Sequence, residues 1–237
     1  TFIADFKEGI TTERSIDILA SEKKLYELPI EPFGGLEQLD WSPDGRYIAY
    51  SCKKKTGKEY AFSTNTEIYI YNVADGSCDI IPMGGGYDTD PVWSPDGQHI
   101  AWLSMARDGY EADKTRLMTA DFSDGKVSGI RDLTAGFKYN AAGPVWDNDS
   151  KTIYFNALAE GLQGIFKVNA DDSISRITPD AQWCDYNSPF AIVHSDKDTM
   201  LLASWCSMDF PTELVKVSVK DGASVQLTHE NDHILSQ

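Results

Sequence analysis

Short apolar stretches alternate with turn-forming residues along the whole chain, and together they form a repeating unit. The segment 39–50, LDWSPDGRYIAY, recurs as 91–102, PVWSPDGQHIAW, and in weaker form as 144–155, PVWDNDSKTIYF. The tryptophans of these copies are 52 and 53 residues apart, and 192–202 is a fainter fourth copy. A fixed period of this length indicates a repeat architecture rather than a sandwich of unrelated strands.

Each copy contains two β-hairpins. The first turns at Ser-Pro-Asp-Gly, where Pro presets φ and Gly accepts the left-handed conformation. Four strands per repeat, with evenly spaced turns, predict an all-β protein: a β-propeller of four-stranded antiparallel blades. The second hairpin is predicted from the strand pairs 67–71 and 78–82, 116–122 and 133–134, 165–168 and 177–178, and 214–219 and 227–228.

The repeats also predict how the chain is divided. Residues 1–35 are expected to hold the outer half of a blade, because 14–29 match 67–82 in length, and 230–237 to begin a next strand or a linker. A propeller closes into a ring to cover its sheet edges. About four and a half blades therefore predict a fragment of a larger ring of seven or eight. The full blades are predicted at 36–83, 84–135, 136–179 and 180–229.

Charge, apolar stretches and cysteine content argue against several classes of partner and site. The chain has 21 Lys and Arg against 37 Asp and Glu, a formal charge of −16, whereas nucleic-acid binding depends on clustered basic residues. No apolar stretch approaches the ~18 residues of a membrane span. Four cysteines without a C-x-x-C pair indicate neither a zinc site nor a disulfide scaffold. Cys184 and Cys206 are a disulfide pair if the protein is exported, and two buried thiols otherwise.

The motif Trp-Ser-Pro-Asp-Gly-x-x-Ile-Ala, with Asp-Gly and Leu-Thr later in each copy, resembles two groups of propellers. They are the TolB-type periplasmic proteins and the propeller domains of prolyl-oligopeptidase-type serine peptidases. Repeats here exceed the about 40–45 residues of compact blades. The extra length lies in arms between the second and third strands, which resemble the dipeptidyl-peptidase and acylaminoacyl-peptidase branch. These arms are 53–66, 105–115 and 156–164.

The resemblance, which covers residues 14–237, implies a propeller that gates and orients peptides for a C-terminal α/β-hydrolase domain with a Ser-Asp-His triad. It favours a periplasmic or secreted location. The sequence 222–226, Gly-Ala-Ser-Val-Gln, lacks the final Gly of a nucleophile elbow and follows a hairpin turn. We therefore expect no catalytic residue and no cofactor in this chain, which should be inactive alone. The alternative is a TolB-like propeller that binds other proteins.

Peptide-binding residues are expected on one face, because loops between blades share a face with the arms and loops on a rigid scaffold commonly bind ligands. The α-ammonium of a free peptide N-terminus pairs with a carboxylate. The second arm offers Glu111 and Asp113 beside Tyr110. Aromatic residues of the connections alternatively seal neighbouring blades. The connections contribute Tyr87, Asp88, Phe137 and Trp183 as candidates.

Two further patterns are interpreted as structural. Residues 229–233 spell His-Glu-x-x-His, which binds zinc only on a helix that brings both imidazoles to one face. The preceding strand end and the poor helix formers between the histidines argue against a metal site. Trp41, Trp93 and Trp146 occupy one blade position, which indicates packing between blades.

Overall fold

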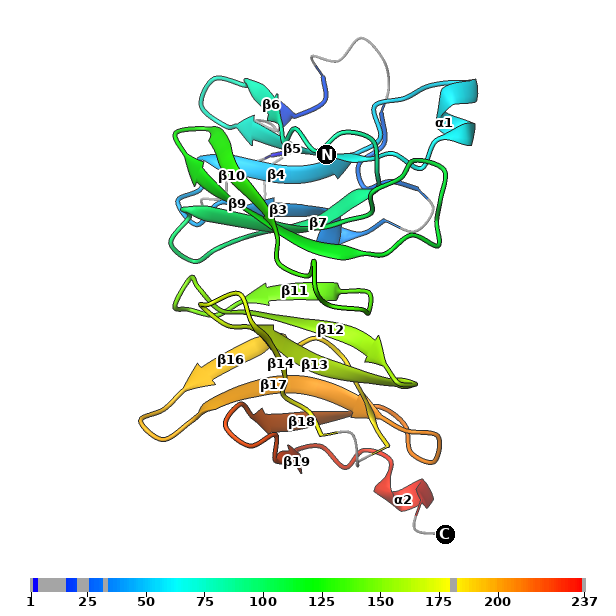
Figure 1. Ribbon diagram of the computed structural model, residues 1–237, viewed down its shortest axis with the longest axis vertical. Helices are drawn as coiled ribbons and strands as arrows, with labels where there is room; N and C mark the ends of the chain where they lie inside the picture. Colours follow the sequence, from blue (N-terminus) through cyan, green and yellow to red (C-terminus); the bar gives the residue numbers. More distant parts are fainter. Residues whose placement is uncertain (1, 4–15, 21–25, 32–33, 180–182, 236–237) are drawn as a thin grey trace.

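The sequence folds into antiparallel sheets that follow one another along the chain. The computed structural model describes residues 2–3, 16–20, 26–31, 34–179 and 183–235 (Figure 1). Within them, four sheets correspond to the four repeats and are called blades 1 to 4. Blades 1 and 2 consist, in order, of β3 (Leu39–Trp41), β4 (Tyr47–Cys52), β5 (Glu67–Asn72) and β6 (Cys78–Ile80), and of β7 (Asp88–Trp93), β8 (His99–Ser104), β9 (Arg116–Ser123) and β10 (Lys126–Asp132).

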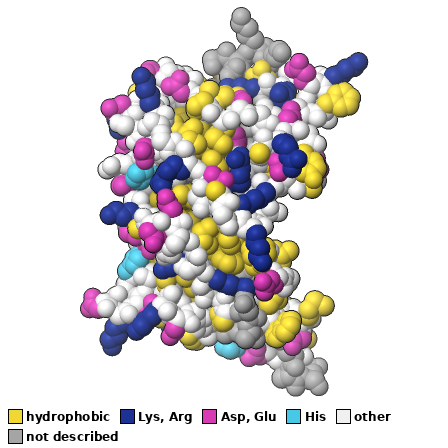
Figure 2. Space-filling model, in the orientation of Figure 1, with side chains coloured by type: hydrophobic (Ala, Val, Ile, Leu, Met, Phe, Trp, Pro, Cys, Tyr) yellow, Lys and Arg dark blue, Asp and Glu magenta, His cyan; other side chains and the backbone are white. Residues whose placement is uncertain are grey.

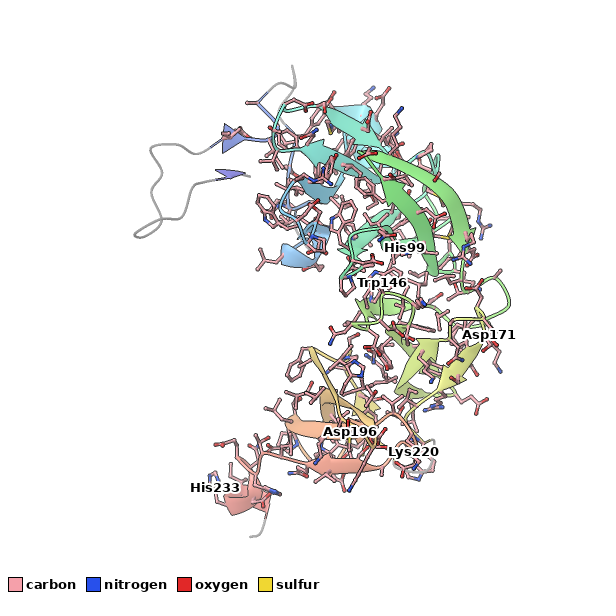
Figure 3. The ribbon with its side chains drawn as sticks, turned by 90° about the vertical axis from the view of Figure 1, so that its left-hand side faces the viewer. His99, Trp146, Asp171, Asp196, Lys220 and His233 are labelled. Atoms are coloured by element: carbon pink, nitrogen blue, oxygen red, sulfur yellow. The ribbon has the colours of Figure 1, made fainter. Side chains whose placement is uncertain are left out.

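In every blade the strands lie in sequence order and neighbours are antiparallel. In blade 4, two short strands share the inner position, since both pair with the same second strand. Figure 3 shows the blades arranged along an arc. The predicted all-β fold of four-stranded antiparallel blades is confirmed. Blade 3 contains β11 (Ala142–Trp146), β12 (Ile153–Ala159), β13 (Leu162–Val168) and β14 (Ile174–Arg176), and blade 4 contains β15 (Asp185–Tyr186), β16 (Ala191–His194), β17 (Thr199–Cys206), β18 (Glu213–Ser218) and β19 (Ser224–Gln226).

The segment before blade 1 forms a small sheet of its own. Strand β1 (Phe2–Ile3) pairs with β2 (Ile16–Asp17), and Ile18 is buried in a cluster with residues of blade 1. Residues 21–25, part of the predicted outer half-blade, lie outside the described residues. The domain boundaries drawn from the repeats, and the number of blades in an intact ring, stay predictions.

The hydrophobic core lies between neighbouring blades. Ile68 of blade 1 packs in one buried cluster with Trp102 and Met118 of blade 2, and the next two junctions are built in the same way. Burial on both faces explains why β4 is buried along its whole length, whereas β6 on the outer rim is exposed. At ~25 cal/mol per Å² of apolar surface buried, these junctions dominate the stabilisation.

The repeated tryptophans connect one blade to the next. The indole Nε1 of Trp93 donates to the carbonyl of Asp40 in blade 1 at 3.3 Å, and that of Trp146 donates to the carbonyl of Val92 in blade 2 at 3.1 Å. Trp41 holds the same position in blade 1 and is 43% exposed. The predicted packing role of these side chains is confirmed at the two junctions where a preceding blade is described.

The Leu-Thr pairs of blades 2 and 4, and Ile177-Thr178 of blade 3, lie just beyond the outer strands, which corrects the predicted strand ends by one or two residues. In blades 2 to 4 the outer strand stops one residue before its pair. The threonine hydroxyl then accepts a backbone N–H from the third strand and so replaces the ladder. These bonds join Leu117 N to Thr134, Ile165 N to Thr178 and Leu214 N to Thr228, at 2.9 to 3.0 Å.

The two ends of the strands form different faces. The turn face carries the Ser-Pro-Asp-Gly turns, on the left in Figure 1, and the arm face carries the arms and the connections between blades. Helix α1 (Lys58–Phe62) belongs to the first arm, and the other short helices are the 3-10 helix η1 (Leu36–Gln38) and α2 (Asp232–Leu235). Among the described residues, no helix has the length and apolar character needed to span a bilayer.

Local hydrogen bonds fix the turns. Gly45 adopts φ 70°, and the carboxylate of Asp44 accepts the Arg46 backbone N–H at 3.0 Å. Hydrogen bonds from the Ser42 hydroxyl and from Arg46 lower the pKa of Asp44 to about 2. In blade 3, Ser150 takes the left-handed conformation at φ 54°, which explains how this weaker copy of the motif still turns.

Candidate functional site

A cavity of about 330 Å³ lies on the arm face between blades 1 and 2, and we call it the arm pocket. Its wall comes from the segment before blade 1, from residues next to strand ends and from the two arms. Two of the predicted binding residues, Tyr87 and Glu111, line it together. The lining includes Gln38, Lys53, Thr66, Tyr87, Met105 and Glu111.

Hydrogen bonds between the two blades fix the floor of the arm pocket. The backbone N–H of Thr66 donates to the carbonyl of Gly86 at 3.1 Å. The hydroxyls of Ser51 and Thr66 both donate to the carbonyl of Asp88, at 2.6 and 2.7 Å. Tyr87 lies between these two anchored residues, and its burial raises the pKa of its hydroxyl. The connection that carries Tyr87 is therefore held rigidly against blade 1.

Asp108 joins the arm of blade 2 to the arm of blade 1. Its carboxylate accepts hydrogen bonds from the backbone N–H groups of Thr64 and Asn65, at 2.7 and 3.1 Å, and from the Ser63 hydroxyl. The Thr64 hydroxyl accepts the N–H of Gly109 at 2.9 Å. These bonds lower the pKa of Asp108. The two arms therefore form one unit beside the pocket.

A second set of contacts shapes the arm of blade 2 internally. The Arg107 guanidinium bonds the carboxylate of Asp113 at 2.9 and 3.2 Å, and it lies 4.1 Å from the ring centroid of Tyr110. The hydrogen bond from Arg107 lowers the pKa of Asp113 to about 2. Asp113 and Tyr110 therefore serve the conformation of the arm, and both are already in contact with a cation.

Three charged side chains line the arm pocket: Lys53 and the carboxylates Glu31 and Glu111. Glu111 is exposed and makes no hydrogen bond or ion pair with any residue that the structure describes. Lys53 lies on the other side, with its Nζ 4.1 Å from the ring centroid of Tyr60, and burial lowers its pKa. The pocket can therefore accept a dipolar ligand, with Glu111 as an uncommitted carboxylate.

The other predicted residues lie elsewhere. Phe137 packs edge-on against Phe155 and Phe166, with centroids 5.5 and 5.2 Å apart, in the core between blades 2 and 3. Trp183 is 78% exposed on the connection into blade 4, away from the arm pocket. Asp88 is buried beneath Tyr87 and opens into a neighbouring cavity. Phe137 thus matches the alternative role of sealing blades.

Sequence reasoning missed Lys53, Thr66 and Met105. Each stands at an end of an arm that the repeats delimit, because the arms are the segments by which these copies exceed a compact blade. Their position at the ends of the arms was the one feature of the sequence that could have pointed to these residues. It could not show which arm residue turns inward, since the arms share no periodic pattern.

The His-Glu-x-x-His pattern does not lie on one helix. His229 precedes the four-residue helix α2, and its Nδ1 lies 3.1 Å from the carboxylate of Asp232. The two histidines therefore do not share a helix face. Within the described part of the chain, no group of three His, Cys, Asp or Glu side chains could hold a metal ion.

Comparison with known proteins shows which curated proteins this sequence resembles. No protein-family model matches it. Dipeptidyl-peptidase 5 of Porphyromonas gingivalis is 40% identical over 237 residues, which cover all of this chain and 33% of that protein. The chain thus spans about a third of the length of the curated relatives it matches.

Solved structures share the fold. Prolyl oligopeptidase B from Galerina marginata has a TM-score of 0.57 at 14% identity, over 84% of this chain and 27% of that chain. A putative TolB from Agrobacterium tumefaciens has a TM-score of 0.56 at 22% identity, over 81% and 64%. Scores this close do not separate the two groups of propellers, whereas 40% sequence identity favours the peptidase group. The chain is a propeller segment homologous to one third of the dipeptidyl-peptidase 5 proteins, which confirms the family resemblance drawn from its repeats.

Proposed function

We propose that this chain is the peptide-gating propeller of a serine exopeptidase of the dipeptidyl-peptidase type. In this proposal, an α/β-hydrolase domain elsewhere in the same polypeptide carries out the chemistry. The observation that carries it is 40% identity to dipeptidyl-peptidase 5 along the whole chain. The chain itself contains no Gly-x-Ser-x-Gly sequence, so it contributes substrate selection rather than a nucleophile.

The arm pocket is the proposed site for the N-terminal part of a peptide. Glu111 is the arm carboxylate proposed to receive the α-ammonium, because it has no other described partner, whereas Arg107 already holds Asp113. Glu31, the second carboxylate of the pocket, belongs to the segment before blade 1 and not to an arm. A charge-assisted contact of this kind favours free amines over blocked ones. Tyr87 supplies an aromatic wall on a rigid connection, and Lys53 provides a positive charge on the opposite side.

The arm face is the proposed contact surface for the hydrolase domain. Large apolar side chains are exposed in its arms and connections and at the end of β12, and a docked domain would cover them. On the side of the molecule seen in Figure 2, Lys and Arg are interspersed with Asp and Glu. The exposed apolar side chains are Phe62, Tyr110, Leu158, Trp183 and Met208.

Kinetics of the natural protein with Glu111→Gln test the role of the pocket. We expect KM to rise about tenfold for peptides with a free N-terminus, because a charge-assisted bond is lost, while kcat changes little. Peptides with an acetylated N-terminus should respond less. Glu59→Gln, on the exposed helix α1, is the matched control. An unchanged KM in the Glu111 variant would show that Glu111 does not bind the peptide N-terminus.

The TolB-like alternative is a binding propeller without catalysis. The fold likeness to the putative TolB is no greater than the likeness to prolyl oligopeptidase B, and the sequence identity favours the peptidase. Labelling of the natural protein with a fluorophosphonate, which reacts with activated serines, distinguishes the two proposals. Stoichiometric labelling supports the peptidase, and its absence together with no Gly-x-Ser-x-Gly in the gene supports the binding protein.

A further inference from the structure

A second cavity lies beside the arm pocket, and Met105 lines both. Its volume is about 180 Å³. We call it the glycine-loop pocket, because the loop Met83–Gly86 forms one side and the ends of β8 and β9 form the other. The residues that matter for its chemistry are Gly84, Gly86, Asp88, Ser104, Met105 and Arg116.

Asp88 is the chemically unusual member of this pocket. Its side chain is 1% exposed, and its Oδ1 has no hydrogen-bond partner among the described residues. Burial raises its pKa to about 6, and the charge of Glu67 acts in the same direction, whereas the Ser104 hydroxyl, the charge of Arg116 and the Trp102 indole act in the opposite direction. A buried carboxylate oxygen without a partner is costly, and native proteins keep such groups chiefly where they have a role.

Arg116 faces the same pocket with donors to spare. Its Nη2 donates to the Ser104 hydroxyl at 2.9 Å, and its Nε to the Ser104 carbonyl at 3.4 Å. No ion pair joins Arg116 to Asp88 in the described part of the chain. A guanidinium has five N–H donors in a planar fork. The pocket thus presents a carboxylate acceptor and a separate guanidinium donor.

The wall of the pocket is built closely and has little room to collapse. Gly84 and Gly85 adopt φ 73° and 99°, which side chains rarely accept. A Cβ on Gly86 would lie 1.6 Å from the carbonyl oxygen of Met105. The carbonyl of Gly86 also accepts the Asn65 side-chain amide at 2.9 Å. These contacts hold the loop in place, so the unsatisfied oxygen of Asp88 is not relieved by a simple shift of the loop.

We propose that the glycine-loop pocket binds a neutral amide group, either a carboxamide side chain or a peptide amide. An amide offers an N–H to the carboxylate of Asp88 and a carbonyl oxygen to Arg116 at the same time. An ammonium group would meet the positive charge of Arg116, and a carboxylate would meet Asp88.

The size of the pocket agrees with this ligand. A volume of about 180 Å³ exceeds the ~30 Å³ share of one water several times over. It accommodates a carboxamide with a short aliphatic stem. Because Met105 lines both cavities, a peptide in the arm pocket can place such a group here. That last step rests on the proposed function, whereas binding of an amide to the pocket does not.

Ligand-observed NMR on the natural protein tests the inference with three probes of equal length: propanamide, propanoate and propylammonium. We expect saturable binding of propanamide with Kd of about 1–10 mM, the range open to a ligand of five heavy atoms. The two charged probes should bind at least about tenfold more weakly, for the electrostatic reasons given above. Equal binding of all three probes, or no saturable signal from propanamide, would overturn the inference.

Two variants locate the site. Asp88→Leu and Arg116→Gln should each weaken propanamide binding about tenfold, since each removes one of the two polar contacts. Glu111→Gln, in the arm pocket, should leave it unchanged. Retained binding in both Asp88→Leu and Arg116→Gln places the amide elsewhere and contradicts the proposal. A negative result for amide binding does not change the expected kinetics of Glu111→Gln, so the amide proposal and the proposed function are tested independently.

Discussion

The turn face and the arm face are built from the same strands, yet their carboxylates are in opposite states. On the turn face, Asp44 and Asp96 accept hydrogen bonds from the backbone and from a serine of the same turn, and both have lowered pKa values. On the arm face, Asp88 is buried with an unsatisfied oxygen and a raised pKa, and Glu111 has no described partner. Figure 3 looks toward the turn face, where Asp171 and Asp196 lie.

This difference separates stability from function. Carboxylates whose hydrogen bonds are made within the turn stabilise the blade and have no capacity left for a ligand. Carboxylates without such bonds cost stability and can accept a ligand donor. The arm face also contains satisfied acids, Asp108 and Asp113, which shape the arms around the pocket. Whether a carboxylate stabilises the fold or can accept a ligand therefore depends on whether its hydrogen bonds are already made, and not only on the face where it lies.

The largest effect is expected at the blade junctions next to the turns. Trp93→Ala removes a nearly buried indole and its bond to the Asp40 carbonyl, so we expect a loss of about 3–5 kcal/mol in unfolding free energy. Trp41→Ala, at the same repeat position but 43% exposed, should cost about 1 kcal/mol. Denaturant unfolding measures both, and equal losses would contradict the junction role.

The second effect concerns Asp88 and pH. Its folded pKa of about 6 lies above the ordinary value of 3.8, so the folded state binds more protons between these values and stability falls as pH rises from about 4 to 6. Asp88→Asn removes this dependence and should be more stable than the natural protein at pH 7 by up to about 3 kcal/mol. Unfolding at pH 4 and pH 7 tests this. Parallel behaviour of the two proteins would show that Asp88 is satisfied.

A smaller effect is expected at a turn carboxylate. Asp96→Ala should lower the unfolding free energy by about 1 kcal/mol without altering KM, because its bonds stay within the turn. The pKa of Asp96 is lowered, so its contribution is present above its unfolded pKa and is lost as pH falls through the folded one. Asp79→Ala, on exposed β6, is the control. A change in KM for Asp96→Ala would contradict the assignment of the turn-face carboxylates to stability alone.

The smallest effect in free energy is expected at the link between the arms. Asp108→Asn weakens the bonds to Thr64 and Asn65, so the arms should position peptides less well. We expect KM to rise about threefold, which is under 1 kcal/mol, with the melting temperature nearly unchanged. Glu59→Gln serves again as the control. A large fall in melting temperature would mean that Asp108 belongs with the structural acids.

The fold was predictable because its signals are local. Ser-Pro-Asp-Gly encodes a turn through the φ preferences of Pro and Gly, and the period of about 52 residues places each turn in a blade. The error in the predicted strand ends also has a local cause. The Leu-Thr pairs resemble strand ends in sequence, and only the bond from Leu117 N to the Thr134 hydroxyl shows that a side chain completes the ladder there.

The site was predictable only in outline. The sequence by itself determined the blades, the arms, and the candidates Tyr87 and Glu111, because turn chemistry and repeat length act over short stretches of chain. Only the tertiary structure decided among the acids, since Asp113 is held by Arg107, Glu111 is uncommitted and Asp88 is buried with its Oδ1 unpartnered. Whether a carboxylate is satisfied depends on groups far away in sequence, and no local pattern records those.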